Sequence, residues 1–409
     1  MEKTMPEQRR EAILVPQAES FGSIAVIRSI GQHGYRVHAA SSKKDALGCR
    51  SNFCSVSHLS PDYQNPDYYP WLQKLIADND IKVIIPSEGF LLAIRQHFEK
   101  LSHLIPINND AEIVYGCLSK SHVFNAFLQS TDPAIQQSIP NTLIANDTDT
   151  VAWSELAGWQ WPLYIKGDGF DGKGHSDSLV KRVENETAAV EIFKTAQQKY
   201  NRILIQDHIP GVKATVNLLI QNGELLAESM AIASHENPHQ GGLTSLRKSW
   251  WQQEMYEDAL RRLQFLNWQG PAMVEYKWNH ATRQFTFIEL NSRYWAALNL
   301  DILAGLHFPA IHVDYFLHGE KPDKIQRLKK NIIVRNALPA DFGYLLSKLK
   351  DSRVPLSAKI KSLIGFCLLP FHPGIKADLF YPGDRKLYFL NFWNFTKELS
   401  AAVLTRLRK

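Results

Sequence analysis

The sequence has few cysteines and lacks the motifs of several common enzyme classes. Its 409 residues include 4 cysteines, whose spacing fits neither a zinc site nor a disulfide framework. No GxGxxG follows the first expected strand, and neither GxxxxGK[ST] nor GxSxG occurs. A dinucleotide fingerprint, a P-loop and a serine-hydrolase nucleophile elbow therefore have no support.

Targeting and membrane-spanning segments are also missing from the sequence. The first 15 residues contain charges but no apolar stretch of signal-peptide length. No apolar run approaches the roughly 18–20 residues that a membrane-spanning helix needs. We therefore expect a cytoplasmic protein that is soluble, or that is attached to a membrane surface at most.

The charge is small but unevenly distributed. The net charge of +5 does not by itself indicate a nucleic-acid partner, and we expect none. Residues 331–409 carry 13 lysines and arginines against 5 acids, which leaves the rest of the chain with a net charge of −3. This basic segment could form an ordinary solvated face, pack against the body of the protein, or make peripheral contact with a membrane.

The hydrophobic pattern predicts mixed α/β and α+β architecture. An apolar run at 12–15, a glycine-containing loop, a helical pattern and a second apolar run at 35–39 predict the opening of a doubly wound sheet. Further along, Asn222-Gly223 separates two strand patterns and predicts a hairpin. With 44% hydrophobic residues, the chain is long enough for two to four packed units.

The segment FTFIELNSR, residues 285–293, is the most informative stretch of the chain. It alternates apolar and polar residues as a strand does, so Glu289, Asn291 and Arg293 fall on one face. Glu275, in the preceding MVEY segment, adds a second acid. Carboxylate and amide oxygens suit Mg²⁺, and an arginine beside them can grip a phosphate or a carboxylate.

Two other segments are consistent with nucleotide binding. In IKGDGFDGKGH, residues 165–175, glycines let backbone N–H groups approach phosphate oxygens, and a lysine can offset their charge. A mobile surface turn would have a similar composition. The strand ILIQDHIPG, residues 203–211, ends in a turn that can offer backbone groups to an adenine ring, although an ordinary strand end would look the same.

The order of these segments over residues 119–309 resembles the ATP-grasp superfamily, in particular its carbamoyl-phosphate-synthase-like and carboxylate–amine ligase branch. The phrases VEYKWN and FIELNSRYWAALNLDILAGLHFP carry most of this resemblance. It implies a Rossmann-like pre-ATP-grasp domain at 1–115, a two-lobed ATP-grasp domain at 116–320 with its small lobe at 145–210, and a basic helical extension at 321–409.

The resemblance also implies a role for each matching residue. Arg293 would stabilise the transferred phosphoryl group, and Arg247 would face the substrate. The metal ligands would be Glu275, Glu289 and Asn291, holding two Mg²⁺ ions, with Mn²⁺ as a substitute. The residues implied to bind ATP are Lys120, Lys166, Gly169, Gly172, Lys173, Gly174, Gln206, Asp207 and Ile209. Relatives often carry a ribose-binding acid just past the hinge glycine, whereas this chain has Lys213 there.

The function implied is that of an ATP- and Mg²⁺-dependent ligase. It would join a small-molecule carboxylate to an amine through an acyl phosphate and release ADP and phosphate. The alternatives are a carboxylase or carbamoyl-type phosphotransferase, and a non-catalytic nucleotide-binding protein of the same fold. The sequence leaves open the identity of the substrates and whether the chain forms an oligomer.

Overall fold

The computed structural model describes residues 11–156, 158–171 and 179–407. These residues form two compact units, and the chain passes between them four times. Unit 1 combines the residues up to Pro106 with Glu224–Trp251 and the residues from Tyr294 onward. Unit 2 consists of Ile107–Gly223 and Gln252–Arg293. Residues 321–409 belong to the same unit as the N-terminal segment, and the three consecutive domains expected above stay a prediction.

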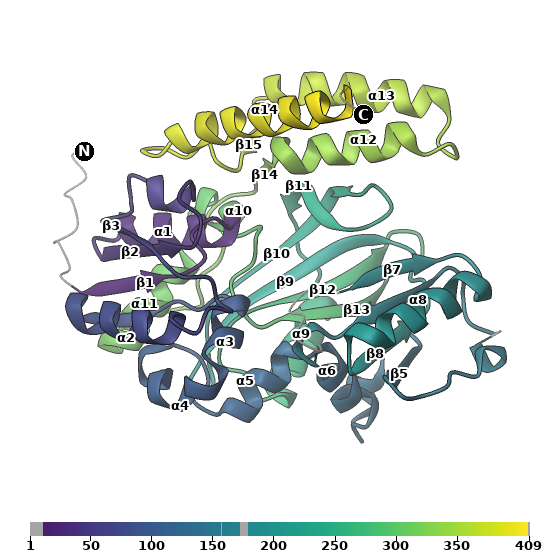
Figure 1. The fold of residues 1–409 in the computed structure, drawn as a ribbon, viewed down its shortest axis with the longest axis horizontal. Helices are drawn as coiled ribbons and strands as arrows, with labels where there is room; N and C mark the ends of the chain where they lie inside the picture. Colours follow the sequence, from purple (N-terminus) through teal and green to yellow (C-terminus); the bar gives the residue numbers. More distant parts are fainter. Residues whose placement is uncertain (1–10, 157, 172–178, 408–409) are drawn as a thin grey trace. The chain divides into compact units, whose positions relative to one another are not determined.

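Unit 1 begins with the expected doubly wound arrangement. Its four-stranded parallel sheet has the order β3-β2-β1-β4. The strand β1 is wholly buried, as its unbroken apolar sequence AILV predicts for a parallel sheet covered on both faces. Figure 1 shows α1 and α2 on opposite sides of this sheet. The strands and helices of this part are β1 (Ala12–Val15), α1 (Phe21–Gln32), β2 (Arg36–Ser41), β3 (Val56–Leu59), α2 (Tyr68–Asn79), β4 (Ile81–Ile84), α3 (Glu88–Ala93) and α4 (Phe98–Leu101).

The later parts of unit 1 add strands and helices from two distant stretches of sequence. The strand β10 pairs antiparallel with β11, β11 pairs antiparallel with β14, and β14 pairs parallel with β15. Among the helices of the described residues, none combines length and hydrophobicity to the degree that a membrane crossing requires. The elements are β10 (Glu224–Asn237), β11 (Leu243–Ser249), α10 (Asn299–Leu303), α11 (Phe308–His318), β14 (Ile333–Arg335), α12 (Phe342–Lys350), α13 (Leu356–Leu368), β15 (Ile375–Ala377) and α14 (Lys386–Leu407).

The C-terminal segment is joined to the N-terminal one by a shared core and a buried ion pair. Leu379 and Leu387 pack in one apolar cluster with Ile24 of α1. The guanidinium of Arg28, also in α1, donates to Asp384 at 2.9 Å and to the carbonyl oxygen of Leu379 at 2.9 Å. These contacts explain why residues more than 300 positions apart fall in one unit.

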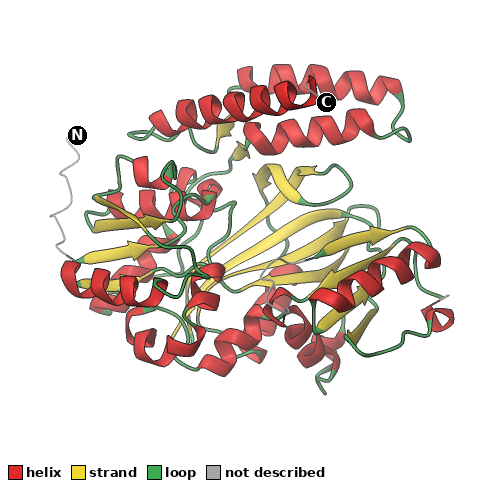
Figure 2. Ribbon diagram, viewed as in Figure 1, coloured by secondary structure: helices red, strands yellow, loops and turns green. Residues whose placement is uncertain are grey.

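Unit 2 contains a smaller antiparallel sheet with the order β5-β8-β6-β7. The helix α8 packs on it (Figure 2), and the shared core includes Ile165, Phe193 and Ile203. A second group of strands, β9, β12 and β13, is antiparallel throughout. The elements of unit 2 are α5 (Ala111–Leu118), α6 (Lys120–Leu128), α7 (Pro133–Gln136), β5 (Thr142–Asn146), β6 (Leu163–Gly167), β7 (Val180–Val183), α8 (Glu186–Lys199), β8 (Arg202–Gln206), β9 (Val212–Gln221), α9 (Gln253–Phe265), β12 (Gly270–Asn279) and β13 (Gln284–Asn291).

Candidate functional site

The centre of the candidate site is a pair of glutamates on neighbouring strands of unit 2. Glu275 of β12 and Glu289 of β13 lie directly opposite each other in the antiparallel register. Asn291 lies two residues beyond Glu289, on the same face, and its Nδ2 is 3.4 Å from Glu275 Oε1. Two carboxylates placed opposite each other repel, so this pair requires cations nearby.

Two lysines provide these cations. Lys120, the first residue of α6, forms an ion pair with Glu289. Lys213 of β9 reaches Glu275, with 2.8 Å between Nζ and Oε2. All four side chains keep some exposure to solvent, so both ion pairs are open to exchange with a ligand. We call Glu275, Glu289, Asn291, Lys120 and Lys213 the carboxylate cradle.

A third lysine lies beneath the carboxylate cradle. Lys166 of β6 is buried, and burial lowers its pKa to about 8, against the raising effect of Glu289. Burial alone would raise the pKa of Glu289, but Lys120, Lys166 and Lys213 outweigh it and lower that pKa to about 2. Three lysines around two glutamates leave a surplus of positive charge that suits a polyphosphate.

A buried aspartate fixes the loop after Lys166 to the helix that begins at Lys120. Asp168 Oδ2 accepts hydrogen bonds from Ser119 Oγ at 2.7 Å, from Ser121 Oγ at 2.7 Å and from Ser121 N at 2.8 Å. Asp168 Oδ1 accepts from the backbone N–H of Phe170 at 3.2 Å. The carboxylate thus holds the start of α6 and the end of β6 together, which places both lysines beside the glutamates.

The segment expected to contact adenine follows β8. Gln206 ends that strand, and its Nε2 donates to Thr142 Oγ1 at 2.9 Å. Asp207 Oδ2 accepts from Asn141 Nδ2 at 2.9 Å, and burial raises the pKa of its carboxyl. Ile209 is partly exposed beyond the strand. The side chains of Gln206 and Asp207 are thus held by Thr142 and Asn141, at the start of β5 in the same chain.

The glycine loop is only partly described. Gly169 begins a short 3₁₀ turn, Gly169–Asp171, immediately after β6. Gly172, Lys173 and Gly174 lie outside the described residues.

The two predicted arginines fall in different units. Arg293 is half-buried, two residues beyond the end of β13 in unit 2. Arg247 is in β11 of unit 1, where Asp378 binds its guanidinium through both carboxylate oxygens, at 3.0 and 2.6 Å. A third bond joins Arg247 to the carbonyl oxygen of Ala297 at 3.1 Å. Arg247 is thus buried with its charge paired, and its predicted contact with a substrate stays a prediction.

Comparison with solved structures identifies the fold. The ADP complex of N5-carboxyaminoimidazole ribonucleotide synthetase matches with a TM-score of 0.60 at 14% identity, over 91% of this chain and 99% of that one. The biotin carboxylase domain of 2-oxoglutarate carboxylase from Hydrogenobacter thermophilus, bound to MgADP, ADP and bicarbonate, gives 0.61 at 12%, over 79% and 73%. The L-amino acid ligase from Bacillus licheniformis gives 0.55 at 14%, over 76% and 75%.

The chain has the ATP-grasp fold. This result confirms the fold resemblance predicted from the order of its motifs. No family model and no curated protein matches the chain at the level of sequence.

The oxygen donors of the carboxylate cradle are of the types that a Mg²⁺ ion takes. Glu275 and Glu289 supply carboxylate oxygens and Asn291 can supply an amide oxygen, which are the ligand types that Mg²⁺ prefers. In the parts of the chain that the structure describes, no group of three or more His, Cys, Asp or Glu side chains is placed to hold a metal. Glu275, Glu289 and Asn291 thus have the donor types of a Mg²⁺ site, and their role as metal ligands stays a prediction.

Two residues of the site were not anticipated in these roles from the sequence. Asp168 belongs to the glycine loop, and nothing in the sequence of that loop indicates its hydrogen bonds to Ser119 and Ser121. Lys213 stands where an acid was expected to hold ribose, but its side chain pairs with Glu275 instead. That pairing depends on the register of β9 and β12, which the sequence of either strand does not reveal.

Proposed function

We propose that this chain is an ATP-dependent ligase that joins a carboxylate to an amine through an acyl phosphate. The observation that carries the proposal is the carboxylate cradle with Lys166 beneath it, in a chain of the ATP-grasp fold. Structures of this fold include complexes with ADP, ATP and MgADP. The substrates would be small molecules, and the reaction would take place in the cytoplasm.

The metal would be held by Glu275, Glu289 and Asn291, as two Mg²⁺ ions that Mn²⁺ could replace. When bound, Mg²⁺ neutralises phosphate oxygens and so lowers the cost of bringing a second anion, the carboxylate, to the γ-phosphorus. Binding would require Glu275 and Glu289 to exchange their lysine partners for the ion. The released Lys120 and Lys213 would then be available to the phosphates.

The other residues of unit 2 would bind and orient the nucleotide. Lys120 and Lys166 would contact phosphate oxygens as point charges, while Asp168 keeps both lysines in place. The backbone from Gly169 onward would donate N–H groups to the phosphates. The adenine ring would lie against the segment Gln206–Ile209, and Arg293 would bind the transferred phosphoryl group.

The reaction would proceed in two displacements. A carboxylate oxygen of the first substrate bonds to the γ-phosphorus while the bond from that phosphorus to the β,γ-bridging oxygen breaks, which releases ADP. The amine nitrogen then bonds to the acyl carbon, inorganic phosphate leaves, and the nitrogen loses a proton. Neither displacement needs a nucleophile from the protein, so positioning and charge stabilisation would supply most of the acceleration.

The direct test is a screen for ADP release that crosses carboxylates with amines, with the product of each hit identified by mass. ADP release that requires both an acid and an amine, with a product of the combined mass less water, supports the proposal. Bicarbonate belongs in the panel of acids, because two of the compared structures are carboxylating or carboxyamino-forming enzymes. Release that depends on bicarbonate alone among the acids would indicate the carboxylase alternative.

The matched variants for this assay are Glu289→Ala and Glu191→Ala. Glu191 is an exposed residue of α8 in the same unit. We expect Glu289→Ala to lower acceptor-dependent ADP release by about a thousandfold, because it removes a metal ligand. Glu191→Ala should leave the rate unchanged. Wild-type turnover by Glu289→Ala would exclude the assignment.

One observation favours a second candidate, a nucleotide-binding protein without turnover. Lys213 neutralises Glu275 internally and so competes with a metal for this carboxylate. ATP binding without ADP release across the full panel would support this candidate.

A further inference from the structure

The helix α13 carries an unusual apolar surface. None of its residues is buried, although it contains five exposed aliphatic residues at the spacing of a helical stripe. Leu356 is 71% exposed, and Phe371, just beyond the helix, is 82% exposed. The exposed stripe consists of Leu356, Ile360, Leu363, Ile364, Leu368 and Phe371.

The neighbouring helix α14 carries a second stripe. Phe389 and Trp393 are 62% and 58% exposed, and they stand one turn apart. Phe392 and Leu399 extend this surface. We call the two exposed stripes of α13 and α14 the apolar face.

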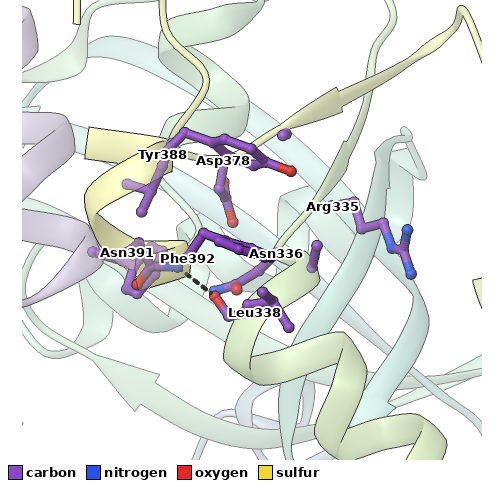
Figure 3. A pocket seen from close by; sticks show the side chains of 11 residues that line it. Arg335, Asn336, Leu338, Asp378, Tyr388, Asn391 and Phe392 are labelled. Atoms are coloured by element: carbon purple, nitrogen blue, oxygen red, sulfur yellow. Dashed lines mark hydrogen bonds between the residues drawn. The ribbon is translucent and has the colours of Figure 1, made fainter. Parts of the chain in front are cut away.

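Both helices have separate inner surfaces that account for their packing. Phe366 of α13 and Phe395 of α14 contact Phe342 of α12, with ring centroids 6.0 and 5.6 Å apart. Asn391 of α14 donates to the carbonyl oxygen of Leu338 at 2.9 Å, beside a cavity of about 20 Å³ (Figure 3). The helices are thus held by other residues, and the apolar face is not needed to fix them.

Most acids of this basic segment are held in ion pairs, and the exception is Glu398, which is exposed on α14. Of the five acids in residues 331–409, three are buried in ion pairs: Asp341 with Arg335, Asp378 with Arg247, and Asp384 with Arg28. A fourth, Asp351, is bound by Arg353 at 3.0 Å. The exposed charged side chains of the segment are therefore mostly cationic, and they include Lys350, Lys361, Lys376, Arg385, Lys386 and Lys397.

The cations border the apolar face directly. Lys359 and Lys361 flank Ile360 in sequence, so each lies about 100° around the helix from it, one on either side of the stripe. The ammonium of Lys397 lies 5.4 Å from the ring centroid of Trp393. The guanidinium of Arg385 lies 5.1 Å from the ring centroid of Phe380, which is itself exposed. Apolar and aromatic side chains bordered by cations match the chemistry of a lipid interface.

We propose that the apolar face docks on the surface of a lipid bilayer that contains anionic headgroups. The aliphatic and aromatic side chains would enter the boundary between headgroups and acyl chains, and the lysines would meet the headgroup phosphates. A second copy of this chain is a poorer occupant, because a self-complementary contact would bring two cationic faces together. The inference goes beyond the proposed function and does not depend on it.

The test is flotation of the full chain with vesicles of phosphatidylcholine, with and without phosphatidylserine. We expect the chain to bind the vesicles that contain phosphatidylserine and to be released as salt is raised. Failure to bind any vesicle, or equal binding to both compositions, would overturn the proposal.

Two pairs of variants assign the binding to the apolar face. The double variant Lys359→Glu with Lys361→Glu should weaken vesicle binding by about thirtyfold or more. Its control is the double variant Lys43→Glu with Lys44→Glu, which changes exposed lysines elsewhere in unit 1 and should not weaken binding. The double variant Ile360→Ser with Leu363→Ser should abolish vesicle binding. Its control, Val56→Ser with Leu59→Ser on the exposed strand β3, should leave binding unchanged. Vesicle binding that survives both α13 pairs overturns the proposal.

Light scattering on the same variants separates a membrane from a second copy. A dimer that Ile360→Ser with Leu363→Ser converts to monomers, together with absence of vesicle binding, would show that the face joins two chains. ADP release, once its substrates are found, provides an independent readout. ADP release should persist in all four double variants, whether or not they bind vesicles.

Discussion

The buried ion pairs of unit 1 and the ion pairs of the carboxylate cradle in unit 2 are built from different residues. In unit 1, three pairs of aspartate with arginine are buried to 3% exposure or less: Arg28–Asp384, Arg247–Asp378 and Arg335–Asp341. In the carboxylate cradle the pairs are glutamate with lysine, Lys120–Glu289 and Lys213–Glu275, and their side chains keep 12 to 28% exposure. Unit 2 also holds a buried pair of the first kind, Arg262–Asp258.

The difference indicates which pairs hold the fold and which can be exchanged. An arginine fork that binds a carboxylate bidentately and also bonds to backbone carbonyls has a fixed geometry. A lysine is a point charge on a flexible stem, so its pairing with a glutamate is easily replaced by pairing with a phosphate. Two of the arginine–aspartate pairs, Arg28–Asp384 and Arg247–Asp378, thus join distant segments of unit 1, while the lysine–glutamate pairs of the carboxylate cradle are the ones that a ligand could replace.

Among the substitutions that test this comparison, Asp378→Ala should cause the largest change, a loss of stability. The change leaves the guanidinium of Arg247 buried without its carboxylate partner, and we expect a loss of about 3–5 kcal/mol in the free energy of unfolding of unit 1. Urea denaturation measures the change, with the exposed Asp323→Ala as the control. A loss as small as that of the control would mean that the pair does not hold the C-terminal segment.

An acid of unit 1 without an arginine fork should show a contrasting pH dependence. Asp301 accepts from Ser229 Oγ at 2.6 Å and from Trp295 Nε1 at 3.0 Å. Burial raises its pKa from 3.8 to about 6, against these hydrogen bonds. An acid with a raised folded-state pKa stabilises the protein below its unfolded pKa and loses that contribution as pH rises through its folded pKa.

The contribution of Asp301 to the free energy of unfolding should therefore fall by about 3 kcal/mol as pH rises from about 4 to about 6. Denaturation of the wild type and of Asp301→Asn across this range isolates the contribution, because other titrating groups are common to both. Parallel pH profiles for the two proteins would show that Asp301 does not titrate in this way.

In unit 2, Lys166→Met should weaken ATP binding about tenfold to a hundredfold, since it removes a charged donor from beneath the carboxylate cradle. Calorimetric titration with ATP measures the effect. Lys194→Met, at an exposed position of α8, is the matched control. Equal affinities for the two variants would show that Lys166 does not contact the nucleotide.

The smallest expected effect is that of Lys213→Ala, and its sign is the informative part. Removing the ammonium frees Glu275, so Mg²⁺ should bind more tightly, by about fivefold, which corresponds to about 1 kcal/mol. The measurement is the Mg²⁺ concentration that half-saturates ATP binding. Weaker Mg²⁺ binding in this variant would indicate that Lys213 supports the ligand rather than competing with the metal.

The sequence predicted the fold and the face that carries the glutamates, because both follow from local patterns. Period-two alternation in FTFIELNSR placed Glu289 and Asn291 on one side of a strand, and β13 has that form. The apolar run at Ala12–Val15 indicated a buried parallel strand, which β1 is.

Long-range pairing could not be predicted in this way. Arg247 meets Asp378 across 131 residues, and nothing near either residue indicates its partner. The apolar cluster that joins Leu379 and Leu387 to Ile24 likewise brings together residues whose proximity no local pattern indicates. The roles of the individual site residues remain predictions until a ligand is bound.

The most direct test of the central claim is calorimetric titration of ATP with and without Mg²⁺. The proteins to compare are the wild type, the double variant Glu275→Gln with Glu289→Gln, and the control Glu191→Gln. We predict that Mg²⁺ tightens ATP binding to the wild type and to the control, and that the double variant loses this dependence on the metal. Undiminished Mg²⁺-dependent binding by the double variant would contradict the assignment of the carboxylate cradle.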